Sequence, residues 1–465
     1  MAQAAGLKRN SSGQAIADLR ELLGERLSTS AAVCEQHGDD LTWHKGQPPD
    51  AVAFVETTEE VSQLVRICGR YQVPVVPYGT WTSLEGHIAA PFGGITVDLS
   101  RMNRILEVNA QDLDCRVEAG VTRKQLNSHL RDTGLFFPID PGADASLGGM
   151  AATRASGTNA VRYGTMRDNV MSLTVVMPDG EIVRTSRRAK KSSAGYDLTR
   201  LIVGSEGTLG VTTEIGLKLS AIPESIAAGV CPFDTVEAAC NAVITTIQMA
   251  VPVARIELVD ADTIAAFNEY SSLGLKVAPT LFVEFHGTSE STAEQSALFN
   301  EIAGEFGGGP FDWATHEEDR NRLWQARHDA FWAVKSQTPG KDYLATDVCV
   351  PISRLAECVN QTQQDIAQCG LYGPIVGHVG DGNFHVQLVF DRDDDKDVRN
   401  VEGVLERLAM RALDMEGTCT GEHGVGLGKK KYLESEHGTA LSVMRTIKRA
   451  IDPENIMNPG KIMEV

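Results

Sequence analysis

Several sequence features that mark whole classes of protein are missing from this chain. Its nine cysteines are scattered and odd in number, and none of them forms a Cys-x-x-Cys pair. A disulfide framework and a cysteine-ligated iron–sulfur cluster are therefore disfavoured, and a reducing compartment is the simplest interpretation. There is no Walker loop, and no Gly-x-Gly-x-x-Gly between an early strand and a helix, so a nicotinamide dehydrogenase is disfavoured too.

Long apolar runs and net positive charge are also absent. No run of about 18 apolar residues occurs, so we expect no transmembrane helix. The 43 lysines and arginines face 62 acidic residues, which gives a formal net charge of −19. This charge argues against nucleic acid or an anionic membrane as the main partner. A small anionic substrate stays compatible, because a local basic site can lie on an acidic protein.

The N-terminal segment, residues 1–10, lacks the apolar core of a signal peptide. We therefore expect a cytoplasmic bacterial protein, with a peripheral position on the inner membrane as an alternative. A eukaryotic source would instead imply a mitochondrial protein.

The length and patterning indicate more than one domain. A chain of 465 residues exceeds the usual limit of about 250–300 residues for a single core. Residues 51–120 are typical of short strands around one helix at 59–71, with Thr58 as its N-cap. Residues 170–185 predict a hairpin. After a boundary at Ile222, helices at 235–249, 262–270 and 290–305 alternate with strands at 254–259 and 280–285. This favours an α+β domain on an antiparallel sheet.

Two further segments stand out by composition. Residues 141–165 are dominated by Gly, Ala, Ser and Thr, and a structureless loop of this length inside a compact domain is uncommon. We interpret the segment as a backbone cradle around a large ligand rather than as a flexible loop. The acidic run at 391–397 is expected to be a solvated turn.

Two glycine-rich stretches, residues 377–385 and 420–426, carry a metal-binding pattern. They contain His378, His385, Glu422 and His423, and histidine with carboxylate suits zinc or manganese. The adjacent Glu422 and His423 suggest that one side chain binds the metal and the other acts on a substrate. Buried histidines bonded to backbone are the structural alternative. A metal-dependent hydrolase, in which Glu422 and His423 activate water, also fits these residues.

The first half of the chain resembles the FAD-binding domain of the vanillyl-alcohol oxidase family, also called the PCMH-type fold. The motifs that carry the resemblance are residues 77–87, 140–150, 159–164, 193–197 and 204–210. It implies an α+β protein: a PCMH-type FAD-binding domain of two α/β subdomains, then an α+β cap domain with an antiparallel sheet. The implied boundaries are 1–224 for the FAD domain, 225–430 for the substrate and metal-binding cap, and 431–465 for a segment that returns to the FAD domain.

In that family, glycine and serine loops hold the FAD pyrophosphate with backbone N–H groups. The resemblance therefore predicts FAD-binding residues in these loops. They are Pro77, Tyr78, Gly79, Thr80, Thr82, Ser83, Leu84, Pro141, Gly142, Ala143, Ser146, Gly148, Gly149, Ala152, Ser156, Gly157, Ala160, Tyr163, Glu206, Gly207, Gly210, Val211 and Asn458.

The second half resembles the C-terminal domain of FAD-linked oxidases. Residues 252–257, 347–353 and 458–461 are most similar to the D-lactate dehydrogenase (cytochrome) branch, which is related to the D-2-hydroxyglutarate dehydrogenases. The resemblance implies oxidation of a D-2-hydroxy acid, D-lactate first and D-2-hydroxyglutarate or glycolate as alternatives, with hydride transfer to flavin N5. Electrons would pass to a cytochrome, a quinone or an electron-transfer flavoprotein, and a homodimer is the candidate assembly.

The same resemblance assigns roles to the remaining residues. His378, His385 and Glu422 would hold a divalent metal, zinc or manganese, and His423 would be the general base, with a partner role beside the metal as its alternative. Arg327 would bind the substrate carboxylate with its planar fork, or form a salt bridge that positions its own helix.

Two residues leave questions open. Relatives usually have Gly or Ala where this chain has Trp81, and a tryptophan disfavours positive φ. Trp81 either obstructs the pyrophosphate or points outward, and an obstructed site would leave a flavoprotein that only binds partners. His87 is either a covalent flavin anchor or, as we expect, a surface or loop histidine.

Overall fold

The computed structural model describes residues 12–40, 43–314 and 316–465, so the prediction for residues 1–10 lies outside the described residues. The chain divides into two compact units. The first comprises Met1–Ala155, Thr165–Ala221 and Glu422–Val465, and the second comprises Ser156–Gly164 and Ile222–Gly421. The chain therefore returns to the first unit at its end. No helix among the described residues is long and apolar enough to cross a membrane.

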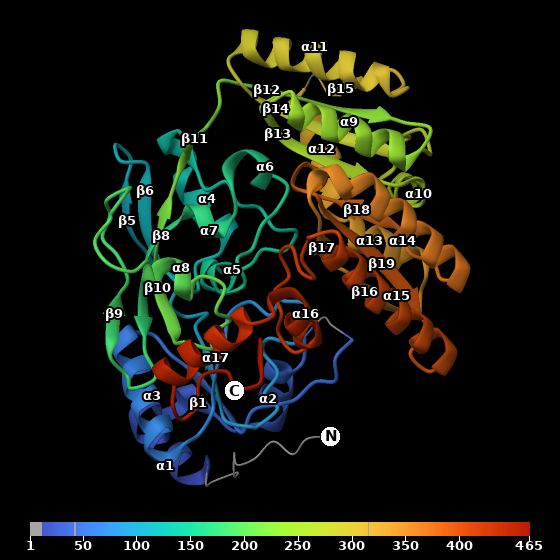
Figure 1. Ribbon diagram of the computed structural model, residues 1–465. Coiled ribbons are helices and arrows are strands. Elements are labelled where there is room, and N and C mark those ends of the chain that lie inside the picture. The colour runs from blue at the N-terminus through green and yellow to red at the C-terminus, as the bar shows by residue number, and fades with distance from the viewer. Residues whose placement is uncertain (1–11, 41–42, 315) are drawn as a thin grey trace. The chain divides into compact units, whose positions relative to one another are not determined.

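The first unit contains two larger sheets (Figure 1). The first has the order β1 (Leu27–Ser28), β2 (Ala51–Phe54), β4 (Ile95–Asp98), β3 (Val75–Tyr78). In this sheet β2, β4 and β3 are parallel, and β1 is antiparallel to β2. The other is antiparallel, in the order β5 (Ile105–Asn109), β6 (Asp114–Glu118), β10 (Val211–Lys218), β8 (Val170–Val176), β9 (Ile182–Arg184). The pairing of β8 with β9 confirms the predicted hairpin.

Helices and short elements complete the first unit. They are α1 (Ser12–Leu23), η1 (Gly24–Arg26), α2 (Ala31–Gly38), α3 (Thr58–Tyr71), α4 (Arg123–Leu130), η2 (Arg131–Thr133), β7 (Leu135–Phe136), α5 (Leu147–Thr153), α7 (Met166–Asn169), α8 (Leu198–Ile202), β11 (Ser220–Ala221), η5 (Lys430–Tyr432), α16 (Leu433–His437) and α17 (Ala440–Ile451). Strands β7 and β11 pair with each other.

Helix α3 illustrates how the sequence sets these elements. Its Val61, Leu64 and Val65 are fully buried at helical spacing, as the pattern predicts. The predicted N-cap, Thr58, was wrong by one residue. The Thr57 hydroxyl accepts a hydrogen bond from the Glu60 amide, and the helix begins at Thr58, because Thr57 has the extended backbone that an N-cap requires.

The second unit is built on a sheet of eight strands, in which every described pairing is antiparallel, as predicted. Its order is β15 (Asp312–Ala314), β12 (Ser225–Pro232), β14 (Thr280–Gly287), β13 (Val253–Val259), β18 (Ile375–Gly377), β19 (Asn383–Phe390), β16 (Asp342–Ala345), and β17 (Val348–Cys349) pairs with β19.

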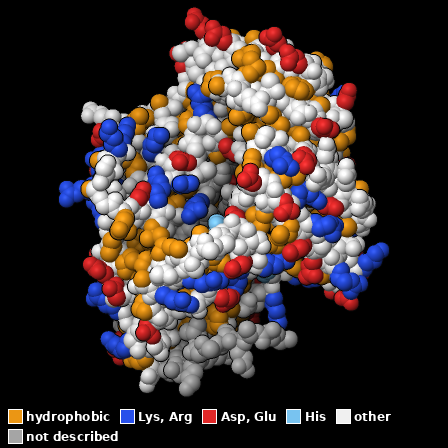
Figure 2. All heavy atoms as spheres, in the orientation of Figure 1, with side chains coloured by type: hydrophobic (Ala, Val, Ile, Leu, Met, Phe, Trp, Pro, Cys, Tyr) orange, Lys and Arg blue, Asp and Glu red, His pale blue; other side chains and the backbone are white. Residues whose placement is uncertain are grey.

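The helices of the second unit form two groups of mutual contacts. One runs through α11 (Ser289–Glu305), α9 (Val236–Gln248), α14 (Leu355–Cys369) and α15 (Asp395–Asp414), and the other contains α10 (Ala261–Ser271), α12 (Glu317–His328) and α13 (Ala330–Gln337). The unit also holds α6 (Ala160–Tyr163), η3 (Ile352–Arg354) and η4 (Val379–Asp381). Figure 2 shows acidic side chains over the outer side of α11, which fits its solvent-facing Glu290, Glu294 and Glu301.

The acidic run at 391–397 is only partly the predicted turn. Asp394 caps a helix by accepting from the Lys396 amide, and α15 begins at Asp395. Acidic residues are stabilising in a first helical turn because they face its unpaired N–H groups. The acidic run therefore includes both a turn and the first residues of α15.

One face of the large sheet changes from apolar to polar along its strands. Val259, Phe282 and Val376 belong to a core with residues of α10, α12 and α13. Side chains alternate between the two faces of a strand, so Glu257 and Glu284 point to the same side as Val259 and Phe282. The polar part of this face, buried but rich in charged groups, is where the second unit places its candidate site residues.

A close approach in the predicted FAD-binding loops gives a stability effect. A Cβ added at Gly148 would lie 2.7 Å from the Ala119 Cβ. We expect Gly148→Ala to destabilise the protein by about 1–3 kcal/mol through overpacking. Gly69→Ala is the matched control, because its Cβ would meet nothing closer than 3.8 Å inside α3, and we expect a gain of about 0.5–1 kcal/mol. Urea unfolding of both variants checks this, and equal stabilities would contradict it.

Candidate functional site

Two of the predicted FAD loops in the first unit are joined by a hydrogen bond from a backbone amide to a side chain. A Cβ at Gly79 would lie 2.3 Å from the Ser146 Oγ, so a larger residue there would displace the Ser146 side chain. The Ser146 amide donates to the Thr80 Oγ1 at 3.0 Å, and the Ser146 Oγ accepts from the Gly149 amide at 3.3 Å. The loop after β3 and the start of α5 are thus in direct contact.

A third loop, residues 204–210, joins these two. The Glu206 amide donates to the Ala152 carbonyl at 3.0 Å, and a Cβ at Gly207 would lie 2.8 Å from the Pro77 Cγ. Gly207 also has φ +73°, a conformation that glycine adopts without steric cost. The three loops that the sequence predicts around FAD therefore meet within the first unit.

The Glu206 side chain has a role that the sequence reasoning missed. Glu206 is buried with φ +52°, and its carboxylate accepts from the amides of Val425 at 2.7 Å and Gly426 at 2.9 Å. It also lies 3.4 Å from the His87 Nε2. The side chain thus anchors the segment that follows His423. The only sequence signal for this is the pair of glycines at 424 and 426, which admit such a close approach.

Burial and charge compete at this pair. Burial lowers the pKa of His87, but the Glu206 carboxylate outweighs it, so the pKa is raised. Burial raises the pKa of Glu206, but the charge of His87 and the two backbone hydrogen bonds hold the pKa below its usual value. The expectation of a surface position for His87 was wrong: His87 lies in a loop, but only 7% of it is exposed.

The C-terminal segment closes the same region of the first unit. The Asn458 Nδ2 donates to the Glu206 carbonyl at 2.7 Å and to the His87 carbonyl at 3.3 Å. The Lys461 Nζ donates to the Ala89 carbonyl at 2.6 Å and to the Asn458 Oδ1 at 3.0 Å. Asn458, predicted to contact FAD, therefore lies among the predicted FAD loops of the first unit.

The second unit brings His378 and His385 together at the polar part of its sheet. Their ring centroids are 5.4 Å apart. The His378 Nδ1 lies 2.8 Å from the Glu257 Oε1, and the His385 Nδ1 lies 2.9 Å from the Thr346 carbonyl. Carboxylate and carbonyl oxygens only accept, so each Nδ1 carries a proton, and in the neutral ring each Nε2 has a lone pair. This is the tautomer that a metal-binding histidine adopts, so the pair fits a divalent metal.

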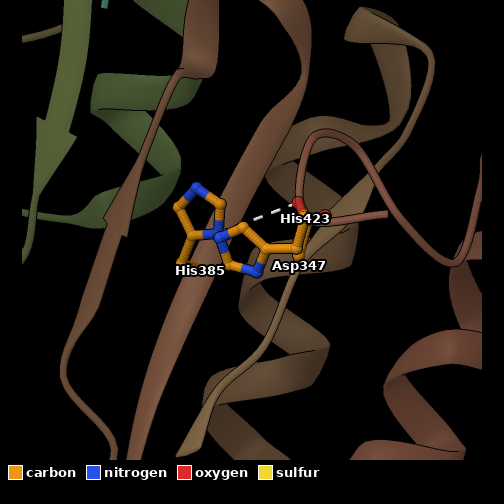
Figure 3. A group of neighbouring side chains, drawn as sticks. All are labelled: Asp347, His385 and His423. Atoms are coloured by element: carbon orange, nitrogen blue, oxygen red, sulfur yellow. Dashed lines mark ion pairs between the residues drawn. The ribbon is translucent and has the colours of Figure 1, made fainter. Parts of the chain in front are cut away.

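Asp347, which lies between β16 and β17, approaches His385. Its Oδ1 is 3.8 Å from the His385 Nδ1, the contact drawn as a dashed line in Figure 3. Asp347 also accepts from the Asn383 Nδ2 and the Thr420 Oγ1, each at 2.8 Å. Sequence reasoning missed Asp347 as a site residue, although it begins the motif at residues 347–353.

Glu422 and His423 begin the last segment of the first unit, directly after Gly421 of the second. The His423 Nε2 lies 3.9 Å from the Glu422 Oε1. A Cβ at Gly421 would lie 2.3 Å from the Asn383 Nδ2, so the residue before Glu422 is packed closely within the second unit.

Arg327 forms the salt bridge that the sequence left open as its alternative role. Its Nη2 donates to the Glu257 Oε2 at 2.6 Å, and both residues are buried. Glu257, which contacts both His378 and Arg327, is a second residue that sequence reasoning quoted in a motif but did not assign.

The predicted FAD residues divide between the two units. Ser156, Gly157, Ala160 and Tyr163 belong to the second, where the Tyr163 hydroxyl lies 2.7 Å from the His286 Nδ1. The others belong to the first: Pro77, Tyr78, Gly79, Thr80, Thr82, Ser83, Leu84, Pro141, Gly142, Ala143, Ser146, Gly148, Gly149, Ala152, Glu206, Gly207, Gly210, Val211 and Asn458.

Comparison with known proteins gives an independent assignment. A family model of an FAD binding domain matches residues 49–186, and the model of the C-terminal domain of FAD linked oxidases matches residues 222–462. The chain belongs to the FAD-linked oxidase family. This oxidase is therefore an FAD-binding oxidoreductase, and both predicted resemblances are confirmed.

Relatives and solved structures agree with this assignment. The probable mitochondrial D-lactate dehydrogenase of Danio rerio is 51% identical, over 97% of this chain and 92% of its own length. The mitochondrial D-lactate dehydrogenase (cytochrome) of Arabidopsis thaliana is 46% identical, over 96% of this chain and 80% of its own. The 4-ethylphenol oxidase of Gulosibacter chungangensis has a TM-score of 0.80 at 21% identity, covering 98% of both chains, and shares the fold.

Trp81 of the oxidase adopts φ +63° and is 44% exposed. A non-glycine residue in this region costs of order 1–3 kcal/mol. We expect Trp81→Gly to stabilise the protein by ~1 kcal/mol, because glycine removes the strain, and to leave FAD affinity within about threefold. Thermal unfolding and FAD titration of the apoprotein measure both. A tenfold gain in FAD affinity would instead show that Trp81 obstructs the pyrophosphate.

The buried Lys461 predicts a pH dependence of stability. Burial lowers the pKa of Lys461 to about 7, partly offset by the charge of Glu206, whereas an unfolded lysine titrates near 10.4. Between these values the unfolded chain binds a proton that the folded oxidase does not, so stability rises with pH. Relative to Lys461→Met, the wild type should gain up to ~1.4 kcal/mol per pH unit from about pH 7 to 10.

Urea unfolding at several pH values checks this expectation. Lys124→Met is the matched control, since Lys124 is an exposed lysine of the same unit, and its curve should run parallel to that of the wild type. A parallel curve for Lys461→Met as well would contradict the prediction.

Proposed function

We propose that this FAD-linked oxidase oxidises a D-2-hydroxy acid, D-lactate in the first place, to the corresponding 2-oxo acid. The observation that carries the proposal is the histidine pair of the second unit, whose Nδ1 atoms are both occupied by acceptors. A site of this chemistry binds oxygen ligands of a substrate through a metal. The two close relatives carry the name D-lactate dehydrogenase, which supports D-lactate as the substrate.

His378, His385 and Glu422 are the proposed metal ligands, and zinc or manganese is the proposed metal. The close packing of Gly421 against Asn383 supports Glu422 as the third ligand, because Glu422 is the next residue and consecutive Cα atoms are only about 3.8 Å apart. When bound, the metal supplies positive charge that makes a coordinated hydroxyl group more acidic.

The FAD loops of the first unit are proposed to bind the cofactor through their backbone N–H groups. The contacts between these loops at Gly79 and Gly207 support this, because they hold the glycine-rich segments close to one another. FAD, when bound, supplies the redox chemistry.

The polar side chains handle the substrate's proton and charge. His423 is proposed to accept the hydroxyl proton, since an imidazole with a reference pKa of about 6.5 is a suitable base near neutral pH. Arg327 is proposed to bind the substrate carboxylate while Glu257 holds it from behind.

The electron acceptor is proposed to be a cytochrome, with a quinone or an electron-transfer flavoprotein as alternatives. The Arabidopsis thaliana relative carries the cytochrome designation in its name, which supports this choice. Both relatives are named mitochondrial, which supports the eukaryotic option among the predicted locations.

Anaerobic stopped-flow absorbance of the flavin tests the proposed function. We expect D-lactate to bleach the flavin band rapidly, with L-lactate as the stereochemical control and D-2-hydroxyglutarate and glycolate in the same panel. Treatment with a chelator should slow the bleaching, and added zinc or manganese should restore it. If no D-2-hydroxy acid bleaches the flavin in metal-loaded protein, the proposal fails. A colourless protein as purified would favour the hydrolase instead.

The proposed base gives a mutational prediction. His423→Gln should slow flavin reduction by D-lactate by roughly 10²–10⁴-fold, because the proton acceptor is lost, while FAD content stays at the wild-type level. His129→Gln, a change at an exposed histidine of α4, is the control and should reduce at the wild-type rate. Rapid reduction by His423→Gln would show that another group takes the proton.

A further inference from the structure

Both oxygens of the Glu257 carboxylate are engaged, each by a residue with a proposed role at the active site. The Oε1 accepts from the His378 Nδ1 at 2.8 Å, and the Oε2 accepts from the Arg327 Nη2 at 2.6 Å. Only 1% of Glu257 is exposed. One side chain therefore contacts a proposed metal ligand and the proposed carboxylate-binding arginine at once.

The position of Glu257 in its strand is unfavourable for a charge. Its neighbours in β13, Ile256 and Leu258, are buried, and its partner across the sheet is Phe282. A buried ion pair is weak evidence for stability, because well-packed apolar residues in its place are often as stable or more so. The carboxylate at this position is better explained by what it holds in place.

His378 and His385 differ in the group that accepts the hydrogen bond from Nδ1. The His385 Nδ1 donates to the neutral Thr346 carbonyl, whereas the His378 Nδ1 donates to the Glu257 carboxylate. A carboxylate behind a histidine fixes the ring orientation and makes the other ring nitrogen a stronger metal ligand. The His378 Nε2 is therefore the better oriented and more basic donor of the pair.

Arg327 is held through one end of its guanidinium. The Nη2 is bonded to Glu257, while the Nε of Arg327 is buried without a hydrogen-bond partner among the described residues. A buried donor without an acceptor costs about 1–3 kcal/mol, and a bound carboxylate would remove this cost. Glu257 thus fixes the arginine while leaving a donor for a carboxylate.

We propose that Glu257 is a positioning residue that couples the two halves of substrate binding, the metal ligand His378 and the carboxylate-binding Arg327. It sets the tautomer of the first and the orientation of the second through one rigid carboxylate on a central strand. This inference rests on the proposed function. It adds that metal affinity and substrate affinity depend on the same side chain.

Glu257→Gln tests the coupling, because one of the two carboxylate oxygens becomes an NH2 group, which cannot accept from His378 or Arg327. The FAD-containing protein is stripped with chelator, titrated with Zn²⁺ or Mn²⁺ by calorimetry, and then assayed for flavin reduction by D-lactate. We expect a 10–100-fold loss of metal affinity together with a rise in the KM for D-lactate. Glu257→Asp, which keeps the charge, should recover part of the metal affinity.

Glu284→Gln is the matched control. Glu284 is a buried carboxylate of the adjacent strand β14, and its ion pairs within the described residues are with His286 at 2.7 Å and Arg255 at 3.6 Å, not with His378 or Arg327. It should lower stability without changing metal affinity. Wild-type metal affinity and KM in Glu257→Gln, with only the stability loss of Glu284→Gln, would reduce Glu257 to a structural residue.

Three further outcomes are decided by the same design. If Glu257→Gln fails to fold, the double variant Glu257→Gln/Arg327→Met removes the buried charge with its partner, and wild-type metal affinity in that variant overturns the proposal. If the wild type binds metal but no D-2-hydroxy acid bleaches its flavin, the proposed function fails, while the effect of Glu257 on metal affinity is still measured. If the wild type binds neither Zn²⁺ nor Mn²⁺, both the proposed function and the proposed role of Glu257 are overturned.

Discussion

The buried carboxylate of Glu206 accepts the amides of Val425 and Gly426, and the placement of the chain's last segment depends on this contact. Two charge-assisted hydrogen bonds to backbone fix a loop more firmly than side-chain contacts on a surface. The His87 Nε2 lies 3.4 Å from the same carboxylate. Because His423 is only two residues before Val425, the position of the proposed base in the first unit is set by a residue from a predicted FAD loop.

The second unit also contains buried carboxylates that hold neighbouring polar side chains by hydrogen bonds. Glu257 binds an imidazole and a guanidinium, and Asp347 binds Asn383 and Thr420. Each such carboxylate is costly to bury and is satisfied by charged or polar donors. The polar part of the sheet face is therefore rigid before any ligand binds, which is the condition for precise placement of a substrate.

Local elements with a clear chemical signature could be predicted from the sequence, whereas contacts between distant segments could not. Helix α9 with its Thr235 cap and the hairpin of β8 and β9 follow from patterns of a few residues. His87 was misjudged because its burial comes from residues more than a hundred positions away. Glu257 was overlooked because a glutamate in an apolar strand has no local signal; only the register of β13 with β18 brings it to His378.

The return of the chain to the first unit has a consequence for biosynthesis. Strand β3 lies at the edge of its sheet, and its Val75 is bridged by Met457, close to the C-terminus. At ~5–20 residues per second, synthesis of the whole chain takes on the order of a minute. For that time the nascent first unit has an unpaired edge strand and lacks Asn458 and Lys461. The first unit is therefore completed only after Met457, Asn458 and Lys461 have left the ribosome.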